Sequence, residues 1–127
     1  MLVALAAGSG GLLLWPLIQA RSAGIGTGEA VRLINREKGV LVDVGEPAEF
    51  AAGHAAGARN IPFATLEAGK GLPTNKALPL IVLCATGARS VRAVAQLRKA
   101  GYANAVALAG GTAAWREASL PVEKSGA

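Results

Sequence analysis

The sequence predicts an α/β fold, a small parallel sheet of about five strands with helices on both of its faces. Two continuous apolar runs, 40–44 and 80–84, are typical of strands that are buried on both faces of a parallel sheet. Each run is followed by a loop or turn and then by residues at helical spacing. Repeated strand–loop–helix units of this length favour parallel strands that are covered by helices.

The expected elements follow one another in the order that this fold requires. Thr27 can cap a helix that extends to about Asn35. After it we expect a strand at 40–44, a helix at 47–52, a turn at 53–58, a brief strand at 60–62, a weak helix at 65–68, a loop at 69–79, a strand at 80–84, a helix that ends at Gly101, a strand at 105–108, and a helix that carries Trp115.

The only cysteine, Cys84, ends the apolar run 80–84 and opens the loop C-A-T-G-A-R-S, residues 84–90. Its thiol is therefore expected at the carboxyl end of a buried strand, on a loop that leads into a helix. Open α/β sheets place ligands at this edge, and a helix N-terminus favours negative charge. The thiolate is the reactive form of cysteine. A buried structural cysteine is the alternative, but Thr86, Gly87 and Arg89 favour a nucleophile.

The composition argues against several classes of function. The formal net charge is +5, but the basic residues are scattered and no run of them alternates with aromatic residues, so nucleic-acid binding is not supported. Attraction to anionic substrates or lipid headgroups is a more modest use of this charge. A single cysteine allows no internal disulfide. His54 and Cys84 are the only soft metal ligands, so we expect neither a metal nor another cofactor.

Residues 1–20 contain no charged side chain and would extend about 30 Å as a helix, enough for one membrane crossing. We expect a transmembrane anchor at 1–20, a flexible tether at 21–26 and a catalytic domain at 27–127. Basic residues lie only on the C-terminal side of the span, which predicts the inner (cell) membrane with the catalytic domain in the cytoplasm. The alternatives are a cleaved signal peptide, which would export the domain to the periplasm, and a mobile N-terminus.

Three segments resemble the signatures of rhodanese domains. They are L-V-D-V-G-E-P-A-E-F-A-A-G-H-A-A-G-A-R-N-I-P (41–62), C-A-T-G-A-R-S (84–90) and G-G-T-A-A-W (110–115). The three motifs occur in the order of the family and cover essentially the whole expected domain. With the N-terminal segment, the chain resembles a single-domain, membrane-anchored rhodanese-like protein of bacteria.

The resemblance implies a sulfurtransferase. Cys84 would attack the outer sulfur of a donor, such as thiosulfate or another persulfide, and a thiol or protein acceptor would then remove that sulfur. Arg89 would tie down the loop, with Asp43 as a candidate partner and part of the substrate site. Backbone amides would surround the persulfide, those of Ala85, Thr86, Gly87, Ala88 and Arg89.

Other residues of the motifs are expected to be structural. His54 belongs to a turn of the family, Trp115 is expected in the core, and Arg59 is expected as a surface charge. Two departures from the family pattern stand out. Position 45 is Gly where the family usually has arginine, and Arg89 is the only charged residue of the loop. Thiosulfate is a dianion, and sulfurtransferases that use it well tend to carry more positive charge at this loop, so the sequence leaves open whether thiosulfate is a good substrate.

Two other functions are weighed against sulfur transfer. A phosphatase or arsenate reductase of the same fold needs a longer loop between cysteine and arginine than the four residues 85–88 present here. A non-catalytic rhodanese-like module that docks partners at the membrane is the remaining alternative. Inactive members usually lose the cysteine, which this chain keeps together with Arg89.

Overall fold

The computed structural model describes residues 24–85 and 88–124 and confirms a parallel α/β sheet with helices on both faces. The main sheet has the strand order β3 (Arg59–Asn60), β1 (Val40–Asp43), β4 (Leu80–Leu83) and β5 (Ala105–Ala107), and every pairing in it is parallel. About five strands were expected and the described residues give four. One residue pair extends the sheet beyond β5, where Ile25 bridges Leu108.

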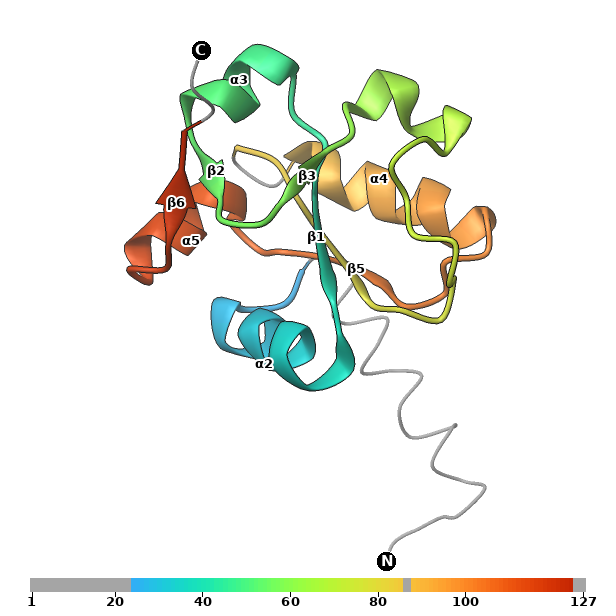
Figure 1. Ribbon diagram of the computed structural model, residues 1–127, viewed down its shortest axis with the longest axis horizontal. Coiled ribbons are helices and arrows are strands. Elements are labelled where there is room, and N and C mark those ends of the chain that lie inside the picture. The colour runs from blue at the N-terminus through green and yellow to red at the C-terminus, as the bar shows by residue number, and fades with distance from the viewer. Residues whose placement is uncertain (1–23, 86–87, 125–127) are drawn as a thin grey trace, which may run out of the picture.

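The described helices alternate with these strands along the chain. They are α2 (Thr27–Glu37), α3 (Pro47–Ala52), the 3-10 helix η2 (Phe63–Ala68), α4 (Ala88–Lys99) and α5 (Gly111–Glu117). Figure 1 shows the chain passing from α2 through β1 to α3, so α3 lies at the carboxyl end of the strands. The same end of β4 delivers Cys84, so α3 lies beside the predicted nucleophile loop.

The side chains of the strands alternate between two hydrophobic cores, as the two-residue period of a strand requires. Leu80 and Val82 of β4 face the core beneath α4 and η2, and Cys84 joins them there. Ile81 and Leu83 face the core on the other side, which contains Trp115 of α5 and the apolar face of α2. All four residues of β4 are fully buried, because this strand is paired on both edges and covered on both faces.

A second sheet was not predicted. β2 (His54–Ala55) and β6 (Val122–Glu123) pair antiparallel within the segment expected as a turn and beyond the last expected helix. The carbonyl oxygen of Pro121 accepts hydrogen bonds from Ala56 N at 3.0 Å and from Trp115 Nε1 at 2.7 Å. These contacts fasten the end of the described chain to the α5 side of the domain.

The start of the domain differs from the expectation in two details. Thr27 is the first helical residue of α2 and Gly26 occupies the N-cap position without a side-chain cap. Ile25, expected in a flexible tether, is only 3% exposed, and its N–H donates to Ala107 O at 2.7 Å. The tether prediction is therefore wrong for Ile25, because an apolar side chain and two backbone hydrogen bonds anchor it at the sheet edge.

The predicted localisation, an inner-membrane protein with a cytoplasmic catalytic domain, is contradicted. Within residues 24–85 and 88–124 no helix is long and apolar enough to cross a bilayer. The longest helix described there, α4, has 12 residues and a length of about 18 Å against a hydrocarbon core of about 30 Å. The predicted span itself, residues 1–20, lies outside the described residues.

Replacement of Ile81 by alanine tests the core that positions β4. Ile81 is fully buried, so Ile81→Ala removes buried methylene and methyl groups and leaves a cavity. We expect the free energy of unfolding to fall by about 2–5 kcal/mol, measured by urea denaturation. Val91→Ala is the control, because Val91 is 41% exposed and its truncation should change stability by no more than about 0.5 kcal/mol. Equal effects of the two changes would contradict the assigned packing.

Candidate active site

Cys84 lies immediately after β4 and is held there by the first turn of α5. Its side chain is 1% exposed. Thr112 N donates to Cys84 O at 2.9 Å, and Ala113 N donates to Ala85 O at 3.3 Å. The amide groups at the start of a helix have no partner within the helix, so they are available for such contacts. The segment around Thr112 therefore fixes the backbone that carries the thiol.

Arg89, in the first turn of α4, forms an ion pair that crosses to α3. Its Nη2 donates to Glu49 Oε1 at 3.0 Å and to Oε2 at 3.2 Å. Glu49 is itself positioned by a capping box, in which its Oε1 accepts Glu46 N–H at 2.8 Å. Sequence analysis named Asp43 as the candidate partner of Arg89. That assignment is wrong, because the longer Glu49 side chain, presented by α3, takes the guanidinium.

The charges around Arg89 show that it lies within electrostatic reach of Cys84. The hydrogen bond that Arg89 donates to Glu49 is the largest cause that raises the pKa of Arg89, and the charges of Glu49, Cys84 and Glu46 add to it. The pKa of Glu49 is lowered, first by the Glu46 backbone N–H and then by Arg89. Arg89 therefore supplies positive potential at the cysteine while its charge is partly offset by Glu49.

Asp43 shapes the turn that follows β1 at the same edge of the sheet. Asp43 is 4% exposed, and its Oδ1 accepts Gly45 N–H at 2.8 Å. Asn60 Nδ2 donates to the carbonyl oxygens of Asp43 and Gly45, at 3.1 and 3.0 Å. Burial is the main reason that the pKa of Asp43 is raised, and the Gly45 N–H, His54 and Arg89 oppose the shift. Asp43 is thus a buried acid beside the loop that follows Cys84.

The predicted amide cradle is described only at its two ends. Ala85 follows the nucleophile, and Ala88 begins α4. Thr86 and Gly87 lie outside the described residues. The role of these amides therefore remains a prediction from the resemblance.

Three further motif residues have structural contacts, as the sequence predicted. His54 is buried, its Nδ1 lies 2.7 Å from Phe50 O, and its ring stacks on Phe50 with centroids 3.6 Å apart. Trp115 is buried in the core. Arg59 is exposed and donates to Gly71 O at 2.8 Å. Among residues 24–85 and 88–124, no three His, Cys, Asp or Glu side chains gather as metal ligands.

A cavity of about 360 Å³ opens beside the cysteine loop. Its walls include Asp43, Glu49, Gly53, Ala85, Thr112 and Arg116. Sequence analysis did not single out Arg116. It directly follows the third motif, 110–115, but nothing in the sequence separates it from the other scattered arginines, because its place at this cavity depends on how α5 packs against the strand ends.

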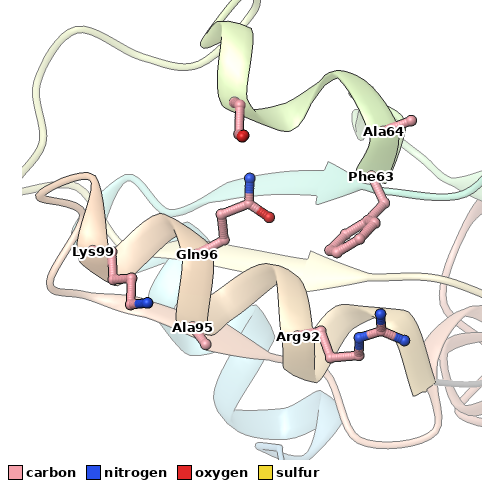
Figure 2. A pocket seen from close by; sticks show the side chains of 7 residues that line it. Phe63, Ala64, Arg92, Ala95, Gln96 and Lys99 are labelled. Carbon is pink, nitrogen blue, oxygen red and sulfur yellow. The ribbon is translucent and has the colours of Figure 1, made fainter.

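A second cavity, of about 680 Å³, lies between η2 and α4. Figure 2 shows the ring of Phe63 pointing from η2 towards α4, and the amide of Gln96 pointing from α4 towards η2. The guanidinium carbon of Arg92 lies 5.5 Å from the centre of the Phe63 ring. Neither cavity is lined by Cys84 or Arg89, but the 360 Å³ cavity is lined by Ala85, which follows Cys84, and by Glu49, the partner of Arg89.

The raised pKa of Asp43 predicts how stability depends on pH. Because burial raises this pKa above its usual 3.8, the folded chain holds the proton more tightly than the unfolded chain. The protonated Asp43 therefore contributes fully to stability at low pH. The free energy of unfolding should fall as pH rises from about 3.8 through the raised pKa of Asp43. Asp43→Asn keeps an acceptor for Gly45 N–H but cannot ionise, so it should lack this fall. Urea denaturation of both proteins between about pH 4 and pH 7 measures this fall. Equal slopes of unfolding free energy against pH in the two proteins would contradict the raised pKa of Asp43.

The comparisons with known proteins agree with this arrangement. The model of the rhodanese-like domain family matches residues 27–118. A protein named sulfurtransferase from Allochromatium vinosum is 34% identical over 92 residues, which cover 72% of this chain and 84% of that protein. The protein slr1261 of Synechocystis sp. is 37% identical over 86 residues, which cover 68% of this chain and 48% of that protein.

A solved structure shares the fold. The crystal structure of thiosulfate sulfurtransferase from Pseudomonas aeruginosa superposes with a TM-score of 0.71 at 27% identity, over 80% of this chain and 20% of that one. This chain thus spans about half the length of the Synechocystis relative and a fifth of the Pseudomonas chain. The family match covers most of the chain and includes β1, Cys84, Arg89 and α5. The chain therefore belongs to the family of rhodanese-like domains.

Proposed function

We propose that this chain is a sulfurtransferase that carries sulfur as a persulfide on Cys84. The observation that carries the proposal is the placement of Cys84. It follows the central strand at the carboxyl edge of the sheet, its backbone is held by α5, and it lies within electrostatic reach of Arg89. Membership of the rhodanese-like family, with a relative named sulfurtransferase, supports the same reaction class.

In the donor half-reaction, the Cys84 thiolate attacks the outer sulfur of a sulfane donor. With thiosulfate, a new S–S bond forms to Cys84, the S–S bond of thiosulfate breaks, and sulfite leaves with the electron pair. The product on the protein is a Cys84 persulfide anion. Arg89 and the amides of the loop are proposed to stabilise this negative charge.

In the acceptor half-reaction, a thiophilic acceptor attacks the outer sulfur of the persulfide. A thiolate RS⁻ forms the persulfide RSS⁻ as the S–S bond to Cys84 breaks, and the electron pair of that bond returns to the Cys84 thiolate. The two half-reactions together are covalent catalysis with no change in the protein. The S–S bond of the persulfide is about 2 Å long, so the outer sulfur, which the acceptor attacks, lies beyond the buried Sγ of Cys84 by that length.

The charges of the site bear on the choice of donor. Arg89 is paired with Glu49, and position 45 carries glycine. Asp43 and Glu46 add negative charge nearby. A dianion such as thiosulfate therefore meets little uncompensated positive charge from Arg89, and Arg116, unpaired within the described residues, lines the adjoining cavity beside the carboxylates of Asp43 and Glu49. We propose that a persulfide of lower charge is the better donor.

The nucleophile is tested by intact-mass analysis of the full chain. After incubation with thiosulfate or a persulfide donor, Cys84 should gain the mass of one sulfur atom, and a reductant should remove it. Cys84→Ser should abolish both the mass gain and thiocyanate formation with cyanide. Activity that persists in the serine variant would refute the mechanism. A wild-type chain that gains no sulfur from either donor would favour the non-catalytic docking module.

The role of Arg89 is tested by comparison with another arginine. Arg89→Ala should lower the rate of sulfur transfer by about a hundredfold to a thousandfold, because it removes positive charge near the thiolate and frees the first turn of α4 from α3. Arg59→Ala is the control, since Arg59 is exposed and its guanidinium donates to the backbone oxygen of Gly71. Steady-state rates with one donor and cyanide measure both. Similar small losses in the two variants would reduce Arg89 to a surface charge.

A further inference from the structure

We propose that the 360 Å³ cavity beside Ala85 binds a small zwitterionic thiol, with the carboxylate of that thiol on Arg116 and its ammonium group on Asp43. A thiol of this class would be the acceptor, or in its persulfide form the donor, of the sulfur carried by Cys84. The inference rests on the proposed function and names the class of substrate for the same site.

The first support is the state of Arg116. Its side chain lines the cavity and forms no hydrogen bond or ion pair with any residue in the described parts of the chain. Arg89, by contrast, is held by Glu49. Arg116 is therefore the guanidinium at this edge that is available to a ligand, and a guanidinium binds a carboxylate in bidentate geometry.

The second support is the glycine that lies under this guanidinium. A β-carbon at position 53 would overlap Arg116 Nη2, so the absence of a side chain at Gly53 allows the guanidinium to lie there. The φ of Gly53 is 165°, an extended conformation that any residue adopts. Backbone strain therefore does not require glycine at this position, and the close approach at Gly53 is that of the Arg116 guanidinium, which a β-carbon there would displace.

The third support is the carboxylate of Asp43. Its Oδ1 accepts Gly45 N–H, and Oδ2 has no hydrogen bond within the described residues. In those residues no fully buried side-chain polar atom lacks a partner, so Oδ2 is not fully buried. Because Asp43 lines the cavity, this oxygen can accept a hydrogen bond from a ligand there. Glu49 also lines the cavity, but Arg89 and Glu46 N–H already occupy its carboxylate.

These groups fit a ligand that carries both charges. The unpaired guanidinium of Arg116 and the carboxylate of Asp43 line the same cavity. Ala85 and Thr112 also line it, so the cavity adjoins the backbone of the loop that follows Cys84. An α-amino acid with a thiol side chain presents a carboxylate, an ammonium group and a sulfur on one short skeleton. Its thiolate would attack the outer sulfur of the Cys84 persulfide, its own persulfide would form, and the Cys84 thiolate would be released.

Binding is tested on the full chain with unreactive probes. S-methylcysteine carries both charges, methylthiopropionate carries only the carboxylate, and methylthioethylamine carries only the ammonium group. In ¹H–¹⁵N NMR titrations, S-methylcysteine should shift the amide signals that line the cavity, those of Gly45, Gly53, Ala85, Thr112 and Ala113. Shifts that avoid these amides, or no shifts, would overturn the proposal.

Variants separate the two charges of the ligand. Arg116→Met should weaken S-methylcysteine and methylthiopropionate by about tenfold or more and leave methylthioethylamine unchanged. Asp43→Asn should weaken the two probes with an ammonium group and spare methylthiopropionate. Gly53→Ala should weaken the carboxylate probes as Arg116→Met does, because it displaces the guanidinium without backbone strain. Arg36→Met is the control, since Arg36 is exposed on α2 and does not line this cavity. Equal weakening of all probes in every variant would overturn the assignment.

A kinetic experiment links binding to sulfur transfer. With cysteine as acceptor, Arg116→Met should raise KM by about tenfold or more while kcat changes little, and transfer to cyanide or cysteamine should be unaffected. Loss of transfer to every acceptor would mean a general structural effect and would overturn the specific role. Failure of the proposed function appears differently, as a wild-type Cys84 that gains no sulfur, and the NMR titrations then still decide whether the cavity binds the zwitterion.

Discussion

The position of the site depends on the pairing of β4 between β1 and β5. Two registers of parallel hydrogen bonds, and hydrophobic cores on both faces, leave this strand no freedom to slip by one residue, since a slip would exchange its two faces. Cys84 is the next residue along the chain. The position of its backbone is therefore fixed by a strand that is paired on both edges and buried on both faces.

The two arginines at this edge of the sheet differ in their contacts. The Arg89 guanidinium joins α4 to α3 through Glu49. Both side chains of this pair are partly exposed and such pairs contribute little to stability, so the contact matters chiefly for the orientation of Arg89. Arg116 carries the same charge on α5 and has no such partner within the described residues.

What the sequence predicts correctly is local. The order of strands and helices, the place of Cys84 at a strand end and the burial of Trp115 follow from apolar periodicity and from turns a few residues long. The contacts that it missed join distant parts of the chain. Glu49 and Arg89 are 40 residues apart, and the pairing of His54 with Glu123 involves strands of only two residues, too short for a periodic signal. Asp43 lies at the end of β1, where a partner of Arg89 was expected. The ion pair of Arg89 is instead with Glu49, whose side chain extends from α3.

Glu49 makes two contacts at once, so a substitution at this position cannot isolate the effect of either contact. One carboxylate closes the capping box of α3 through Glu46 N–H and also holds Arg89. A change at this position therefore shortens a helix and unbalances a charge in the same step, and the two losses do not add with those of changes at Glu46 or Arg89. Related sequences should accordingly change Glu46, Glu49 and Arg89 together. Arg116 and Gly53 form a separate pair, which can change while the cysteine loop stays intact.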